Sequence, residues 1–113
     1  MTVKEVAEAL GLKVRSGAAK LDQEVSGVYV SDLLSDVMAH AQEGNIWITL
    51  QIHPNVIAVA TLLNLAAVII SRGAEPEAAT LSRADEEGIP VLTTNQPTFE
   101  VAGRLYQLIG AAK

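Results

Sequence analysis

The chain has 113 residues, half of them hydrophobic, and carries a formal net charge of −5 at pH 7. This length predicts a single domain over residues 1–113 with one core, and the composition excludes an intrinsically disordered chain. The eight basic residues are scattered and only 4% of the residues are aromatic. Because nucleic acids are bound mainly by clustered basic and stacking aromatic side chains, we expect no nucleic-acid partner.

The absence of cysteine excludes disulfides, thiolate metal sites and a cysteine nucleophile. The first residues, Met1 to Glu5, lack the basic and then apolar pattern of a signal peptide. The longest apolar stretch, residues 56–70, is interrupted by Thr61 and Asn64 and is too short to cross a bilayer. We therefore expect a soluble, cytoplasmic protein that does not bind membranes.

A short helix and a loop are predicted for residues 1–24. Thr2 and Glu5 have the spacing of a capping box, and apolar residues then recur at helical spacing up to Leu10, with Gly11 as the stop. Residues 12–14 are a candidate for a brief strand. The polar and small residues of 16–24 predict a loop.

From residue 25 to about residue 110, segments typical of strands and helices alternate. Strands are predicted at 25–30, 46–50, 66–70 and 90–92, where apolar and β-branched residues form short runs. Helices are predicted from Ser31-Asp32 to about 42, over 56–63, from 75–76 to about 87, and from about 97 to about 110. These repeated βα units predict a three-layer α/β/α fold with a mostly parallel sheet of four to five strands. Because the strands are apolar almost throughout, helices are expected on both faces.

Four polar segments follow the predicted strands, at the edge where open parallel sheets bind ligands. The candidate ligand-binding residues are Ser31, Asp32, Gln51, His53, Asn55, Ser71, Arg72, Gly73, Thr93 and Thr94. Each segment precedes a predicted helix, whose free N–H groups and partial positive charge favour an anion such as a nucleotide phosphate. The same residue types also cap helices and shape turns, so a purely structural interpretation stays open.

Two of the candidates carry groups that can be interpreted in more than one way. His53 stands at a strand end, where its imidazole can contact a ligand or carry a proton near neutral pH, or can serve only in the turn before Pro54. Arg72 can pair with a phosphate or carboxylate of a ligand or a neighbouring subunit, or remain solvated.

The acidic residues Glu75 and Glu77 are interpreted as a helix start that suits the helix dipole, and residues 85–87 as a solvated face.

The usual catalytic motifs are missing. The sequence contains no GxxxxGK[ST] phosphate loop, no GxGxxG dinucleotide fingerprint and no GxSxG nucleophile elbow. Its two histidines are isolated from each other in sequence and do not form a metal-ligand set. We therefore expect no catalytic residues, no cofactor and no metal site.

In the order of its segments, the chain from Val25 to Ile109 resembles stand-alone DRTGG-domain proteins. Residues 25–38, the strand at 46–51, the helix at 55–65, the strand at 67–70 and residues 88–94 follow the pattern of that family in order. Ser71-Arg72-Gly73 lies where the family commonly has its Thr-Gly-Gly turn, and only the final glycine is retained. The Asp-Arg pair of the family name would fall near His53-Pro54-Asn55 and is absent.

The resemblance implies a fold similar to the N-terminal domain of HPr kinase/phosphorylase and an accessory, regulatory role without catalysis. We accordingly expect a homodimeric regulatory domain that senses a nucleotide or phosphorylated metabolite, or that interacts with a larger signalling or metabolic enzyme. The candidate dimer interface is the last helix, with Phe99, Val101, Ala102, Leu105, Tyr106 and Ile109. Two alternatives stay open: a small-molecule-binding enzyme that uses His53, and a scaffold for a kinase or redox complex that has no ligand.

Overall fold

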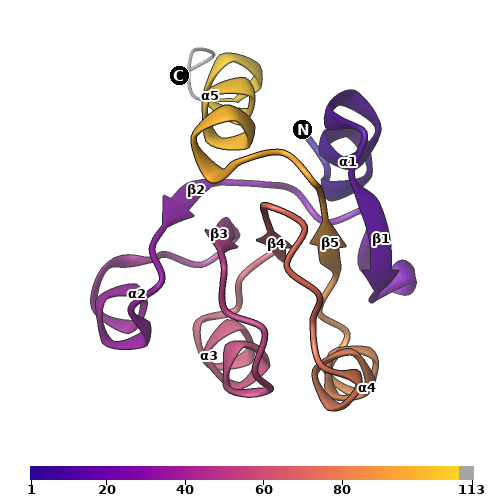
Figure 1. The fold of residues 1–113 in the computed structure, drawn as a ribbon, viewed down its shortest axis with the longest axis vertical. Coiled ribbons are helices and arrows are strands. Elements are labelled where there is room, and N and C mark those ends of the chain that lie inside the picture. Colours follow the sequence, from indigo (N-terminus) through magenta and orange to yellow (C-terminus); the bar gives the residue numbers. More distant parts are fainter. Residues whose placement is uncertain (110–113) are drawn as a thin grey trace.

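The structure, a computed structural model, describes residues 1–109, which form one five-stranded sheet between two layers of helices (Figure 1). The strands are β1 (Lys13–Ser16), β2 (Gly27–Val30), β3 (Asn45–Thr49), β4 (Ala67–Ile70) and β5 (Val91–Thr93). The helices are α1 (Val3–Leu10), α2 (Leu34–His40), α3 (Asn55–Leu63), α4 (Ala78–Glu87) and α5 (Thr98–Leu108), with a single 3-10 turn, η1 (Ala18–Lys20). The predicted three-layer α/β fold with a mostly parallel sheet is confirmed. The predicted end of the last helix, near residue 110, lies outside the described residues.

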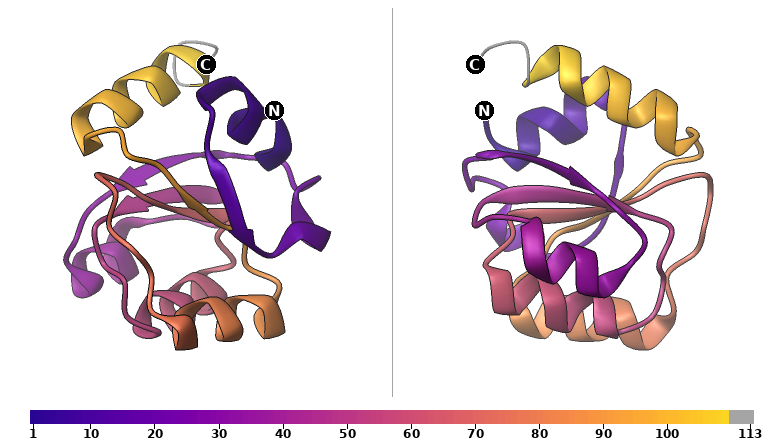
Figure 2. Two further views of the ribbon diagram at one scale, coloured as in Figure 1. Left: turned by 45° about the vertical axis from the view of Figure 1, so that its right-hand side comes forward. Right: turned by 90° about the vertical axis from the view of Figure 1, so that its left-hand side faces the viewer.

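The strand order is β1-β5-β4-β3-β2, and the strands from β2 to β5 are parallel. Consecutive parallel strands are therefore neighbours, and repeated crossovers of one hand place the intervening helices on the same face. The views agree that α2, α3 and α4 cover one face and that α1 and α5 cover the other (Figures 1 and 2). The chain changes face after β5, while β1 pairs with β5 in the antiparallel direction.

Each face of the sheet has its own apolar core, because side chains alternate along every strand. Ile46 and Ile48 of β3 pack in the cluster with α1 and α5, whereas Trp47 packs in the cluster with α2, α3 and α4. All three side chains are fully buried. The expectation that both faces of the sheet are covered is confirmed.

The first helix has the capping box that its sequence predicts. The Thr2 hydroxyl accepts a hydrogen bond from the Glu5 N–H at 3.2 Å, and the Glu5 carboxylate accepts one from the Thr2 N–H at 2.8 Å. Gly11 ends the helix with a φ of 67°. This helix leads directly into β1, which belongs to the same sheet as the repeated βα units.

Two helices begin later than predicted because side-chain and backbone groups near their starts bind elsewhere. Before α2, Asp32 binds the end of β3 and therefore does not cap the helix. Before α4, Glu77 has an extended backbone and its N–H donates to the Ile52 carbonyl at 3.2 Å. The Thr80 hydroxyl donates to the same carbonyl at 2.6 Å.

None of the helices within residues 1–109 is long and apolar enough to cross a membrane.

Candidate functional site

A polar pocket of about 460 Å³ lies beyond the carboxyl ends of β4 and β5. The chain leaves β4 toward α4 on one face of the sheet and leaves β5 toward α5 on the other face (Figure 1). Loops that part in this way leave a crevice, which is the usual place for a ligand in an open α/β sheet. The pocket is lined by Gly11, Lys13, Arg15, Gly73, Ala74, Glu75, Thr93, Thr94, Asn95 and Gln96.

The two loops at this crevice are tied together by backbone hydrogen bonds. The N–H of Arg72 donates to the Gln96 carbonyl at 2.8 Å, and the N–H of Gly73 donates to the Thr94 carbonyl at 2.9 Å. Arg72 and Gly73 both have positive φ angles, 58° and 70°. A Cβ at Gly73 would lie 3.1 Å from Oδ1 of Asn95. Glycine at this position therefore permits both the left-handed turn and the close approach of the two loops.

The charged groups of the pocket come from β1 and from the loop after β4. Lys13 and Arg15 both line the pocket, although the register of β1 against β5 shifts at Arg15, so the strand is irregular there. Nη1 of Arg15 lies 2.9 Å from Oε1 of Glu75, and Nη2 lies 2.5 Å from Oε2. This bidentate contact raises the pKa of Arg15 and, with a smaller attraction from Lys13, lowers the pKa of Glu75. Within residues 1–109, the Lys13 ammonium group has no side-chain hydrogen bond or ion pair.

Three of the predicted site residues, Gly73, Thr93 and Thr94, line this pocket. The Thr94 hydroxyl accepts hydrogen bonds from the backbone N–H of Gln96 at 3.1 Å and from its Nε2 at 3.0 Å. Thr93 is the residue of β5 that lies opposite Lys13. Ser71 is buried, and its hydroxyl is hydrogen-bonded to that of Thr98 at 2.6 Å, which joins the end of β4 to the start of α5.

The predicted residues after β2 and β3 are hydrogen-bonded within and between these two loops instead. Oδ1 of Asp32 accepts hydrogen bonds from the Thr49 hydroxyl at 2.9 Å and the Leu50 N–H at 2.7 Å. Nε2 of Gln51 donates to the Asp32 carbonyl at 2.7 Å, and the Ser31 hydroxyl accepts from the Leu33 N–H at 3.2 Å. These contacts fit the structural interpretation of the segment, and none of these residues lines the polar pocket.

His53 and Asn55 also lie outside the polar pocket. Nδ1 of His53 accepts a hydrogen bond from the Asn55 N–H at 3.0 Å, so the imidazole satisfies a free N–H at the start of α3. Both residues are exposed. This arrangement fits the interpretation of His53 as a turn residue, and the hydrogen bond engages its imidazole as a helix cap.

Sequence reasoning missed the two cations and the carboxylate of the pocket. Lys13 and Arg15 fell in or beside a segment considered only as a brief strand, and its pairing with β5 placed them at the crevice. Their spacing at alternate positions was the available signal. The interpretation of Glu75 as part of a helix start is wrong, because α4 begins at Ala78 and the Glu75 carboxylate binds Arg15.

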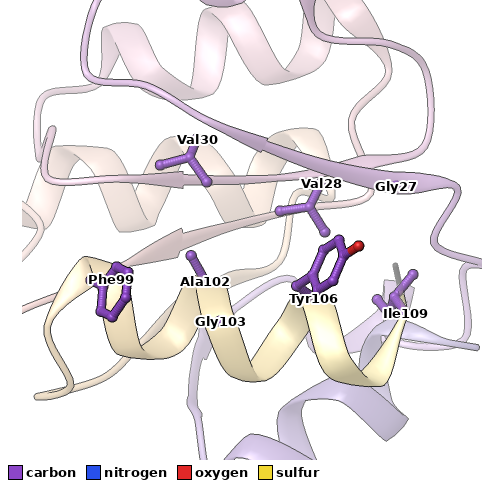
Figure 3. Close-up of a pocket in the computed structure, with 8 residues that line it drawn as sticks. All are labelled: Gly27, Val28, Val30, Phe99, Ala102, Gly103, Tyr106 and Ile109. Carbon is purple, nitrogen blue, oxygen red and sulfur yellow. The ribbon is translucent and has the colours of Figure 1, made fainter. Parts of the chain in front are cut away.

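A second surface is an apolar groove of about 440 Å³ between the edge strand β2 and α5 (Figure 3). It is lined by Gly27, Val28, Val30, Phe99, Ala102, Gly103, Tyr106 and Ile109. Phe99 is 90% exposed, which is unusual for a large apolar side chain. Of the residues predicted for a dimer interface, Val101, Leu105 and Ile109 are buried in the core of the domain itself. Phe99 and Tyr106 are exposed.

Within residues 1–109, no group of three or more His, Cys, Asp or Glu side chains is arranged to hold a metal ion. The ionisable contacts in this part of the chain are pairs or hydrogen-bonded clusters at the surface, such as Asp36 with Tyr29 and His40. The hydrogen bond from the Tyr29 hydroxyl is the main cause of a lowered Asp36 pKa.

Comparison with protein-family models matches residues 5–108 to the DRTGG domain. Among solved structures, one similar fold is the crystal structure of the CBS and DRTGG domains of the regulatory region of Clostridium perfringens pyrophosphatase, complexed with its activator, diadenosine tetraphosphate. The TM-score is 0.71 at 17% sequence identity, over 89% of this chain and 44% of that chain. The chain therefore spans less than half the length of that structure. No curated protein sequence matches the chain.

Proposed function

Because the chain belongs to the DRTGG domain family, we propose that it acts as a single, non-catalytic regulatory domain that responds to an anionic ligand in the polar pocket. The observation that carries this proposal is the position of Lys13 and Arg15, whose charges converge on the crevice between the β4 and β5 loops. Two cations against the single carboxylate of Glu75 leave this concave polar site with a net positive charge, which attracts an anion.

The chemistry of the pocket favours a phosphate-bearing ligand. An arginine fork matches the geometry of a phosphate or carboxylate, and a free lysine adds a flexible donor. The Asn95 side chain and the Thr94 hydroxyl are polar groups at the same site. Its volume is within the range of pockets that hold small-molecule ligands. The activator named for the pyrophosphatase regulatory region is a nucleotide polyphosphate, so we propose a nucleotide or phosphorylated metabolite as the ligand class.

Calorimetric titration with pyrophosphate, ATP and diadenosine tetraphosphate tests this proposal. We expect at least one of them to bind, and Lys13→Gln to weaken that binding about tenfold through the loss of a charged donor. Arg83→Gln, an exposed change on α4 away from the pocket lining, is the matched control and should leave the affinity unchanged. Failure of all three compounds to bind, or equal losses in the two variants, would contradict the proposal.

We also propose that the domain forms a homodimer through the apolar groove. The exposure of Phe99 favours a dimer, because its ring protrudes beside β2, an edge strand that has no second neighbour within the described sheet. Exposed strand edges and apolar patches are typical sites of association. A twofold-symmetric contact of this kind would place the same groove of both copies in one interface.

Light scattering during size-exclusion chromatography tests the dimer. The unmodified protein is expected to elute as a dimer, and Phe99→Glu as a monomer, because the substitution places a charge in the interface. Leu62→Glu makes the same kind of change at a 65% exposed residue of α3 and should leave the dimer intact. A monomer at high concentration in the unmodified protein would refute this role.

We propose that the domain transmits its ligand state to a larger signalling or metabolic enzyme in the cytoplasm. We also propose that it shares the fold of the N-terminal domain of HPr kinase/phosphorylase. The match to the DRTGG domain supports the accessory role. The hydrogen bond that engages His53 as a helix cap favours this role over an enzyme that uses the imidazole.

A further inference from the structure

We infer that Glu75 is an internal competitor for the ligand at Arg15, so that an anion enters the polar pocket by displacing the Glu75 carboxylate. This inference rests on the proposed function of the pocket and assigns its regulation to one ion pair. The pair lies inside the pocket lining, where the carboxylate has the bidentate geometry that a phosphate would have on the same guanidinium.

Arg15 is the fixed member of the pair. Its side chain is only 19% exposed, and the residues immediately before and after it in β1 pair with β5, across a shift in register at Arg15. Next to it in sequence, the Ser16 hydroxyl donates to the Ile89 carbonyl and accepts from the Val91 N–H, both at 3.1 Å. The strand that carries the guanidinium is therefore held by contacts that do not involve Glu75.

Glu75 is the member that can leave. Its side chain is 68% exposed and lies in the irregular segment between β4 and α4. Its side-chain hydrogen bonds within residues 1–109 are those with Arg15. The segment is held on either side of Glu75 by backbone bonds of Ala74 to Ser71 and of Glu77 to Ile52. The carboxylate can therefore swing toward solvent without disturbing the sheet or α4.

The charge balance determines which ligands can compete. Glu75 brings one negative charge to a point that both Arg15 and Lys13 attract, as the lowered pKa of its carboxyl group shows. A pyrophosphate group carries more negative charge than one carboxylate and can contact both cations at once. The ion pair therefore disfavours singly charged anions and leaves the pocket selective for polyphosphates, because only these offset the loss of the internal contact.

Glu75→Gln is the test, because it keeps the shape of the side chain and removes its charge. With inorganic pyrophosphate as the probe in calorimetry, we expect the variant to bind about two- to fivefold more tightly than the unmodified protein, the range that corresponds to a surface ion pair. Glu77→Gln removes a nearby exposed charge that does not contact Arg15 and serves as the control. It should change the affinity by less than Glu75→Gln does.

The outcomes separate this inference from the proposed function. Pyrophosphate binding that is unchanged or weaker in Glu75→Gln would overturn the competition while leaving the anion site intact. Absence of binding in both proteins would overturn the site and the competition together. A thermal-unfolding series adds a second readout: Glu75→Gln should be no more stable than the unmodified protein without ligand, yet should show the larger rise in Tm when pyrophosphate is added.

Discussion

Gly17→Ala is expected to destabilise the protein by about 3 kcal/mol, roughly 1 from backbone strain and the rest from overpacking. Gly17 has a φ of 69°, a conformation that residues with a Cβ rarely adopt. A Cβ at this position would lie 2.4 Å from the Pro90 nitrogen and 2.6 Å from the Ile89 oxygen. Both are backbone atoms beside β5, so relief of the clash requires β1 to move away.

Gly11→Ala is the matched control for Gly17→Ala. Gly11 has nearly the same φ, 67°, but an added Cβ would meet nothing within 4 Å. The Gly11→Ala variant should therefore lose only about 1 kcal/mol of its free energy of unfolding, from backbone strain. Urea unfolding of both variants should measure the difference. Because β1 carries Lys13 and Arg15, Gly17→Ala should also weaken anion binding. Equal stability losses in the two variants would show that the close approach to Ile89 and Pro90 is not required.

The parallel part of the fold was predictable because its strands and helix ends are marked by short runs of neighbouring residues. Runs such as residues 46–48 and Ala67–Ile70 are apolar at consecutive positions, which is typical of strands buried on both faces. Glycines such as Gly88 mark the ends of the helices between them. For strand β1 the sequence offered only a candidate brief strand at residues 12–14, without its extension to Ser16 or its pairing with β5. Its four residues show no apolar run, and the hydrogen bond of Ser16 to Val91 joins residues 75 positions apart in the sequence.

The candidate site could be predicted only to the correct edge of the sheet. Strand ends can be located from sequence, but the face to which each following helix turns is decided by packing of the whole layer. The crevice opens after β4 and β5 because α4 and α5 lie on opposite faces (Figure 1). After β2 and β3 both helices lie on the same face, and Asp32 and Gln51 bond across the closed loops instead.

Electrostatic roles within the site depend on the same long-range pairing. The sequence places Glu75 next to Pro76 before an acidic helix, which is compatible with a favourable interaction with the helix dipole. The antiparallel pairing of β1 with β5 instead brings Arg15 within reach of that carboxylate, and the two form an ion pair. A local pattern cannot specify a partner that lies 60 residues away.

Trp47→Ala is expected to cost about 3–5 kcal/mol, the largest loss among the variants considered. Trp47 is fully buried at the centre of β3, in the core beneath α2, α3 and α4. Its indole Nε1 donates to the Ser31 carbonyl at 2.7 Å, so it also holds the loop after β2. The truncation removes both the packing and this hydrogen bond.

Trp47→Phe separates the two contributions. Phenylalanine retains most of the apolar contact but leaves the Ser31 carbonyl without the indole N–H, so we expect a smaller loss of about 1–2 kcal/mol for the hydrogen bond. Leu62→Ala, which truncates a side chain that is 65% exposed, should change the free energy of unfolding by less than about 0.5 kcal/mol. Urea unfolding followed by circular dichroism measures all three, since the only tryptophan is lost in two of them. A Trp47→Phe variant as unstable as Trp47→Ala would mean that the hydrogen bond to the loop, rather than the buried ring, stabilises this side of the sheet.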